Sequence, residues 1–253
     1  MFNPLDYPFL ILAISLPIFW CSTLIGGWFH RRARNFGQDS HADFQFVVGG
    51  TLTLLVLIIG FTFSMAVNRY DMRKNYEEQE ANAIGTEYVR ADLLSPADAA
   101  RVQSLLRNYL DQRILHYGAR NRQRLREIEV ETSRLQAELW SAVAKPGVAQ
   151  PTCVMALVVS GMNDVLNAQG YTQAAWWNRI PVGAWCLVAL ISVFCNVLIG
   201  FAAHGRSGFL FLILPIALSV SLFLIADIDG PRGGVIRVHP QNLEALEISL
   251  HSS

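Results

Sequence analysis

The chain has 253 residues, of which 52% are hydrophobic and 16% are charged. A soluble domain carries about 25% charged residues, so this composition indicates a membrane protein. The 20 Lys and Arg residues balance the 20 Asp and Glu residues. This neutrality argues against a general nucleic-acid binder, which uses a net positive charge to meet phosphates.

Four apolar stretches are long enough to cross a bilayer, which takes about 20 residues. None contains Asp, Glu, Lys or Arg, and a charge at the centre of a membrane helix costs about 2.5–3.5 kcal/mol. We therefore predict four transmembrane helices, at residues 8–29, 46–67, 181–203 and 208–226. The first has no basic segment before it and no small-residue cleavage motif after it, so we expect a retained helix and not a signal peptide.

Most of the charge lies between the second and third spans, because 14 Lys and Arg and 13 Asp and Glu fall between Asn68 and Ile180. This distribution predicts an all-α membrane protein with four transmembrane helices and a helical soluble domain inserted between helices 2 and 3. The predicted parts are the first two spans at 1–67, the soluble domain at 68–180, the last two spans at 181–226 and a C-terminal segment at 227–253.

The central region is predicted to be helical. No glycine or proline follows the second span before Gly85, so this helix is expected to continue for about four turns beyond the bilayer. Its polar stalk should pack against other stalks or face solvent. Ser95, Pro96 and Asp98 have the order of an N-cap, a first helical residue and a first-turn carboxylate, which predicts a helix start. Further helices are predicted at 121–143 and 153–169.

One face of the second span repeats every four residues, at Thr53, Leu57, Phe61 and Met65. This face could line a narrow hydrophobic pore, face lipid or pack against other helices, and its spacing alone does not choose between these. Small residues at the same spacing permit close helix approach, and they are Gly49, Thr53, Gly60 and Ser64.

The third span carries a polar stripe in which Ser192, Asn196, Gly200 and His204 follow one another four apart. Polar side chains within membrane helices usually face other helices or water. We favour helix packing with one interhelical hydrogen bond from Asn196, and a role in permeation or ligand binding is the alternative.

After the fourth span the sequence reads ADIDGPRGGVIRVHP, which places Asp227 and Asp229 before a group of glycines. A phosphate loop would also need Lys-Ser or Lys-Thr and a following helix. A metal site would need further ligands, for which His239 and Glu244 are the only nearby candidates. We favour a membrane exit, in which the carboxylates end the apolar span and Gly230-Pro231 breaks the helix.

No group of residues suggests catalysis. The six histidines are scattered, and the chain lacks G-x-S-x-G and H-E-x-x-H. No two of the four cysteines form a C-x-x-C pair, so we expect buried structural thiols in place of a disulfide framework or a zinc site. We therefore expect that the protein is not an enzyme and that it uses no cofactor and no metal.

Three stretches together resemble the bestrophin-like family of bacterial membrane proteins. They are EQEANAIGTEYVRADLLSPADAARVQSLLRNYLDQRI at 78–114, RIPVGAW at 179–185 and ADIDGPRGGVIRVHP at 226–240. The last contains a signature of the family at Asp229, Pro231 and Gly233. The family places a phenylalanine after this proline, and Arg232 replaces it here.

The resemblance implies an architecture and a function. Bestrophins are pentameric anion channels whose four-span subunits line a hydrophobic neck with the second span. By this resemblance we expect a homo-oligomer, a pentamer, that conducts monovalent, chloride-like anions across the bacterial inner membrane, with Thr53, Leu57, Phe61 and Met65 at the neck. The soluble domain would be cytoplasmic and would bind no nucleic acid. The alternative is a non-conducting scaffold or sensor whose soluble helices bind a partner.

Overall fold

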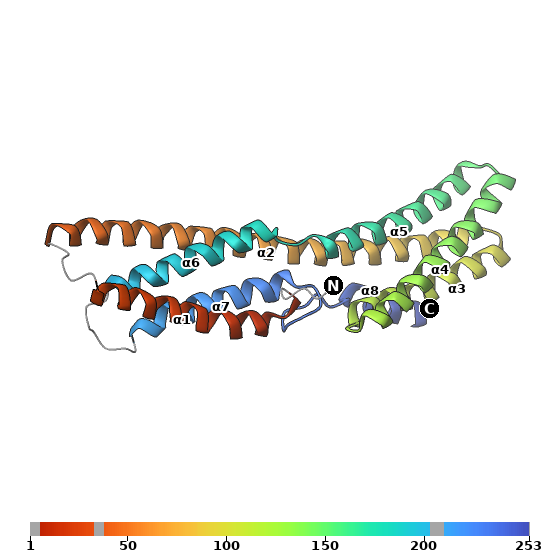
Figure 1. The fold of residues 1–253 in the computed structure, drawn as a ribbon. Coiled ribbons are helices and arrows are strands. Elements are labelled where there is room, and N and C mark those ends of the chain that lie inside the picture. The colour runs from red at the N-terminus through yellow and green to blue at the C-terminus, as the bar shows by residue number, and fades with distance from the viewer. Residues whose placement is uncertain (1–5, 33–37, 203–209, 253) are drawn as a thin grey trace. The chain divides into compact units, whose positions relative to one another are not determined.

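The computed structural model describes residues 6–32, 38–202 and 210–252, and every regular element in these ranges is helical. Figure 1 shows the helices in chain order. They are α1 (Pro8–Arg32), α2 (Gln38–Arg90), the short 3₁₀ helix η2 (Ala91–Leu93), α3 (Pro96–Gly118), α4 (Arg122–Ala149), α5 (Cys153–Trp177), α6 (Val182–Ala202), α7 (Leu210–Asp229) and α8 (Gln241–Ser252).

The chain forms two compact units. The first comprises residues 1–69 and 179–237, and the second comprises residues 70–178 and 238–253. Helix α2 contributes to both, because it passes the boundary at Arg69 without a break. These boundaries lie close to the predicted ends of the central region at Asn68 and Ile180. The predicted C-terminal segment 227–253 is not one part, because its beginning belongs to the first unit and the residues from Val238 to the second.

The first unit contains α1, the first part of α2, α6 and α7. Four helical stretches are long and apolar enough to cross a membrane, within Pro8–Arg32, Phe44–Leu93, Cys153–Ala202 and Phe211–Asp229. They contain the first two predicted spans, residues 181–202 of the third and residues 211–226 of the fourth, and positions 203, 208 and 209 lie outside the described residues. Within this unit α1 packs against both α6 and α7 (Figure 1).

Glycines bring α1 and α6 into backbone contact. A Cβ atom added at Gly200 would lie 2.0 Å from the Thr23 carbonyl oxygen, and one added at Gly26 would lie 2.0 Å from the Val197 carbonyl oxygen. A real carbon atom does not fit at either distance, so both positions need a residue without a side chain. The two helices are therefore held closer than any other residue type would allow.

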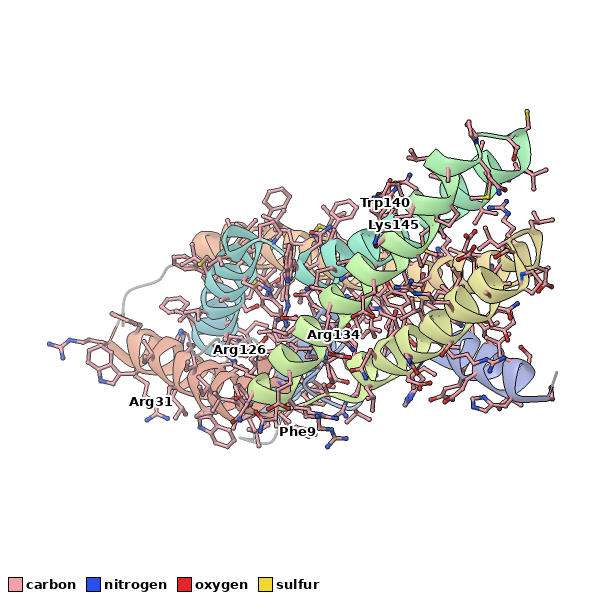
Figure 2. The ribbon with its side chains drawn as sticks, turned by 90° about the vertical axis from the view of Figure 1, so that its right-hand side faces the viewer. Phe9, Arg31, Arg126, Arg134, Trp140 and Lys145 are labelled. Atoms are coloured by element: carbon pink, nitrogen blue, oxygen red, sulfur yellow. The ribbon has the colours of Figure 1, made fainter. Side chains whose placement is uncertain are left out.

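The second unit contains α3, α4, α5, α8 and the second part of α2. Its core is a cluster of buried apolar side chains that includes Ile84, Leu106, Leu139 and Met162. Helix α3 begins as predicted, since the Ser95 hydroxyl accepts a hydrogen bond from the Asp98 amide at 3.3 Å. The predicted helices at 121–143 and 153–169 both extend further, to Ala149 and Trp177. Figure 2 shows the exposed side chains of Arg126, Arg134 and Lys145 along α4.

The polar stalk after the second span was predicted to pack against other stalks or to face solvent, and the structure corrects this prediction for one of its faces. Helix α2 continues past Gly85 to Arg90, and its charged residues Arg73, Glu77, Glu80 and Glu87 are at most 1% exposed. Their positions recur at the helical spacing of three or four residues, so these side chains lie on one face of α2. Other helices of the same chain bury this face. One face of the stalk is thus part of the second unit's interior.

The contact between α1 and α6 can be tested with a single methyl group. Replacing Gly200 with Ala should lower the free energy of unfolding by about 1–3 kcal/mol, because the helices must move apart to admit the methyl. The matched control is Gly183→Ala in the same helix, where no atom lies within 4 Å of the added Cβ. That change should leave stability equal or raise it, since alanine favours a helix over glycine. Thermal unfolding of both variants in detergent measures the difference, and equal melting temperatures would contradict the prediction.

Candidate functional site

The predicted neck residues lie along one exposed ridge of α2. Leu57 is 52% exposed, Phe61 63% and Met65 37%, and Thr53 is also exposed. The residues of α2 that face the rest of the first unit are different ones, Leu55, Thr62 and Ala66, each at most 2% exposed. The four residues therefore share one face of α2, and their own subunit does not cover them.

The membrane part of α2 packs less within its own chain than the other spans do. In its most apolar stretch 11% of the residues are buried, against 28% in α1 and 44% in α7. Gly49 and Gly60 have no atom within 4 Å of an added Cβ, in contrast to Gly26 and Gly200. The small residues of α2 therefore do not serve helix packing inside the subunit.

The polar stripe of the third span lies in the contact between α1 and α6. Ser192 and Asn196 are both fully buried. The Asn196 amide donates to the Ser192 carbonyl at 2.7 Å, and its Oδ1 lies 3.3 Å from the Thr23 hydroxyl on α1. The stripe thus forms a helix–helix contact with one interhelical hydrogen bond at Asn196. Gly200 belongs to the same contact, and His204 lies outside the described residues.

The carboxylates after the fourth span accept hydrogen bonds from backbone amides. Asp227 accepts from the amides of Val235 and Ile236 at 2.8 and 2.9 Å. Asp229 accepts from the Ile180 amide at 3.2 Å, at the entry to α6. Both side chains are at most 2% exposed. The pair therefore closes a turn and fixes the end of α7 to the start of α6.

Two glycines allow this turn to close. Gly234 has a φ of 101°, a conformation that residues with side chains rarely adopt, and an added Cβ would lie 1.7 Å from Asp227 Oδ1. An added Cβ at Gly233 would lie 1.9 Å from the Asp6 carbonyl oxygen. Asp6 in turn pairs with Arg179 at 2.6 Å. Two of the family-signature residues thus contact the backbone of other segments: Gly233 lies against the Asp6 carbonyl, and Asp229 accepts from the Ile180 amide.

A metal site was the alternative for these carboxylates. In residues 6–32, 38–202 and 210–252, no three or more His, Cys, Asp and Glu side chains gather as metal ligands would.

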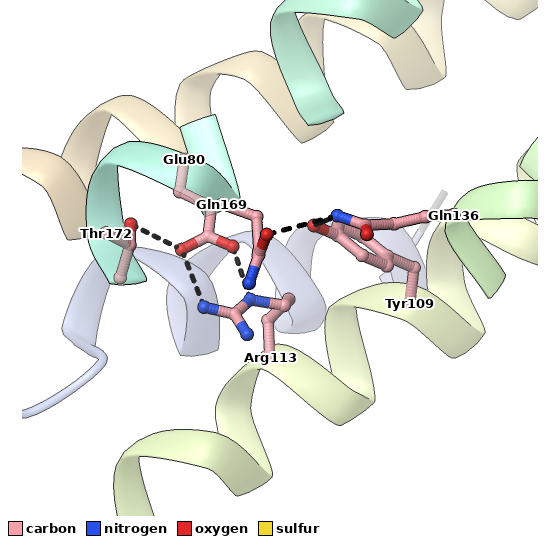
Figure 3. A network of polar contacts seen from close by, with 6 residues as sticks. All are labelled: Glu80, Tyr109, Arg113, Gln136, Gln169 and Thr172. Carbon is pink, nitrogen blue, oxygen red and sulfur yellow. Dashed lines mark hydrogen bonds and ion pairs between the residues drawn. The ribbon is translucent and has the colours of Figure 1, made fainter. Parts of the chain in front are cut away.

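A buried polar network in the second unit was not anticipated from the sequence. Glu80 on α2 pairs with Arg113 on α3, and the Thr172 hydroxyl on α5 donates to Glu80 at 3.0 Å (Figure 3). Beside this pair, Gln136 on α4 lies 3.4 Å from both the Tyr109 hydroxyl and Gln169. Burial and the negative charge of Glu80 raise the pKa of Tyr109, so its phenol stays neutral. The network joins four helices through groups that would be costly to bury alone.

Glu77 binds the beginning of α8. Its carboxylate accepts from the backbone amides of Asn242 and Leu243 at 2.9 and 3.0 Å, and from the Asn242 side chain at 2.6 Å. A negative charge at a helix N-terminus is favourable because unpaired amides and the helix dipole meet it there. Glu77 thus holds the C-terminal helix against α2.

Glu87 is buried without a hydrogen-bond partner among the described residues. Its carboxylate lies on the backbone of α5, where an added Cβ at Gly161 would be 2.0 Å from Glu87 Oε2. Burial raises the pKa of Glu87 from 4.5 to about 8, with Arg90 opposing the shift and Asp164 adding to it. The side chain therefore stays largely protonated near neutral pH.

The comparisons with known proteins agree on one family. A family model described as the Bestrophin-like domain matches residues 18–243. Several crystal structures of a bacterial bestrophin homologue from Klebsiella pneumoniae also match. One has 13% identity and a TM-score of 0.65, covering 96% of this chain and 97% of that chain. A tyrosine-to-alanine variant has 14% identity and a TM-score of 0.68, covering 95% and 98%. At these identities the structural likeness shows the fold alone.

A leucine-to-threonine variant of the same homologue has 13% identity and a TM-score of 0.65, covering 97% of this chain and 98% of that chain. The comparison with curated proteins found no match.

The protonation of Glu87 should make stability depend on pH. Because its pKa is about 8 in the folded chain and about 4.5 when unfolded, the folded state binds more protons between these values. The free energy of unfolding should therefore fall as pH rises from about 5 to about 9. Glu87→Gln keeps the size and removes the charge, so this variant should lose the decline and be more stable than the parent at pH 9.

Denaturant unfolding at several pH values measures this dependence. Glu78→Gln is the matched control, because Glu78 is an exposed carboxylate on the same helix. It should keep the parent's dependence. A parental decline that persists in Glu87→Gln would assign the effect to another group.

Proposed function

The chain belongs to the bestrophin-like family, and on that basis we propose that it is an oligomeric ion channel selective for monovalent anions. The observation that carries the proposal is the exposed apolar ridge of α2 at Thr53, Leu57, Phe61 and Met65. Several copies of this ridge around one axis would form stacked apolar rings. Such rings expel water when the passage is narrow, and an ion then meets a dehydration barrier.

Lipid could cover an exposed apolar helix, but two features favour other copies of the chain. The membrane part of α2 is the least buried of the spans, and its glycines at positions 49 and 60 meet no atom of their own subunit. In a bilayer, small residues promote helix association because they let backbones approach closely. We propose a homo-oligomer with α2 nearest its axis, and a pentamer by analogy with bestrophins.

The geometry of the ridge sets a requirement on the assembly. Residues four apart follow a line inclined by about 26° to the helix axis. The four side chains can therefore line one straight passage only when α2 is tilted against it. Arg69 is the next residue at this spacing, and a positive charge at one mouth would raise the local concentration of anions. This is the physical basis for proposing anion selectivity.

We further propose that the second unit and both termini lie in the cytoplasm of a bacterial cell, with the spans in the inner membrane. Four spans return the chain to the side on which it started. Near the span ends, that side carries Arg69, Arg73, Lys74, Arg179, Arg232 and Arg237. The other side carries Arg31, Arg32, Arg34 and Arg206. The positive-inside tendency favours the side with more basic residues.

Cysteine labelling tests this orientation. Cys21, Cys153 and Cys186 are exposed in the chain, contrary to the expectation of buried thiols, so all four native cysteines are first replaced by serine. Ser104→Cys, at an exposed position of α3, should then react with an impermeant maleimide only after the cells are opened. Ser40→Cys, between the first two spans, should react in intact cells. The opposite pattern would invert the proposed topology.

The neck is tested by paired measurements on Phe61→Ala. If Phe61 forms a ring around the passage, the smaller residue should widen it and raise halide flux per oligomer, because the dehydration barrier falls. Phe61→Glu should lower anion flux, because it places several negative charges around one axis. Phe63→Ala is the matched control, since Phe63 is exposed on the same helix but lies off the ridge. It should leave flux near the parental value.

Flux is measured in proteoliposomes and divided by the amount of oligomer counted by native mass spectrometry. If Phe61 instead packs between copies, Phe61→Ala should cost about 3–5 kcal/mol of stability and reduce assembly. Unchanged flux per assembled oligomer would then exclude the neck assignment. A parent protein that assembles but conducts no halide would favour the non-conducting scaffold.

A further inference from the structure

A cavity of about 570 Å³ opens within the second unit, at a place where three helices end or begin. Its walls come from the segment before α3, the first turns of α3, the last turns of α4 and the beginning of α5. This volume is in the range of small-molecule pockets, about 300–1,000 Å³. The cavity is separate from the ridge of α2 that carries the proposed channel function.

Two basic side chains line the cavity from different helices, Arg101 on α3 and Lys145 on α4. Both are exposed. Within the described part of the chain, neither forms an ion pair or a hydrogen bond, which leaves both side chains available to a ligand. Two cations that line one cavity both attract an anion that enters it.

One carboxylate also lines the cavity, and it is already engaged. Asp98 accepts a hydrogen bond from the Ser95 hydroxyl at 2.7 Å. Two cations against one carboxylate leave the cavity with a formal charge of plus one. The remaining wall is mixed, because Ser141, Gln150 and Thr152 contribute polar groups and Leu94, Val154 and Met155 contribute apolar ones. The lining thus combines a formal charge of plus one with neutral polar groups and an apolar patch at Leu94, Val154 and Met155.

We infer that this cavity binds a small organic carboxylate, whose anionic group lies between Arg101 and Lys145 and whose apolar body lies against Leu94 and Val154. A carboxylate carries one negative charge and matches the formal charge of the site. The planar arginine fork presents parallel N–H donors to such a group. A phosphate monoester would bring nearly two negative charges and leave one unbalanced beside Asp98. The bound molecule would join α3, α4 and α5.

The probe is 4-fluorobenzoate, which has one carboxylate, an apolar ring and a fluorine nucleus visible by NMR. Fluorine titrations of the full chain in lipid nanodiscs, with empty nanodiscs as blank, should give saturable binding in the millimolar range expected for so small a ligand. The neutral 4-fluorobenzamide has almost the same shape and should bind at least tenfold more weakly. Equal binding of the two would show that charge does not contribute, and would overturn the inference.

Variants locate the binding. Arg101→Gln and Lys145→Gln should each weaken 4-fluorobenzoate binding about tenfold. Arg126→Gln is the matched control, because Arg126 is exposed on α4, outside the cavity lining, and its replacement changes the net charge equally (Figure 2). It should bind as the parent does. Asp98→Asn should bind severalfold more tightly, since it removes the opposing carboxylate, and misfolding cannot produce a gain.

Other outcomes would overturn the inference. If 4-fluorobenzoate shows no saturable binding up to a concentration 20 times a Kd of about 1 mM, the cavity does not bind such a carboxylate. Tighter binding of phenyl phosphate than of benzoate would contradict the carboxylate assignment. If Arg101→Gln abolishes assembly in native mass spectrometry and the parent binds no probe, a second copy of the chain occupies the cavity.

Discussion

The second unit depends on pairing charges that it has removed from water. Helix α2 brings Arg73, Glu77, Glu80 and Glu87 into the interior, and an unpaired buried charge costs several kcal/mol. Glu80 is paired by Arg113 and Glu77 by the amides of α8. Glu87 has neither and stays protonated instead. The partners of Glu80 and Glu77 lie on α3 and α8, so these two charges favour the packing of both helices against α2.

The first unit also buries charged carboxylates, and it pairs them with backbone amides. A chain leaving a membrane helix must satisfy the amides that no longer have helical partners. Asp227 and Asp229 supply acceptors for three of them, and Gly234 allows the tight turn that brings two of these amides to Asp227. The helices α1 and α6 are in close contact at Gly26 and Gly200, and Asn196 accepts a hydrogen bond from the Thr23 hydroxyl across the same contact.

The sequence alone predicted those features of the fold that depend on residues close together in the chain. The four apolar stretches appear within candidate spans, and the N-cap at Ser95 begins α3. The end of α4 was placed too early, since the helix continues through Pro146 to Ala149 although proline disfavours a helix interior. The burial of one face of the stalk was missed, because a charged residue gives the same local sequence pattern whether it contacts water or a residue far away in the chain. Glu80 and Arg113 are 33 positions apart, and no local pattern relates them. The role of Asp227 was equally ambiguous in the sequence, since a carboxylate can bind a metal or accept a hydrogen bond from an amide.

The attachment of α8 to Glu77 has a consequence for biosynthesis. The carboxylate and the amides that it accepts from are 165 and 166 positions apart, so α8 is made long after α2. While the ribosome is still adding the preceding residues, Glu77 has no donor from α8 and must keep its water. The second unit therefore cannot close fully until α8 has been made and has left the ribosome. Until then, a nascent subunit exposes the α8-binding side of α2 to chaperones and proteases.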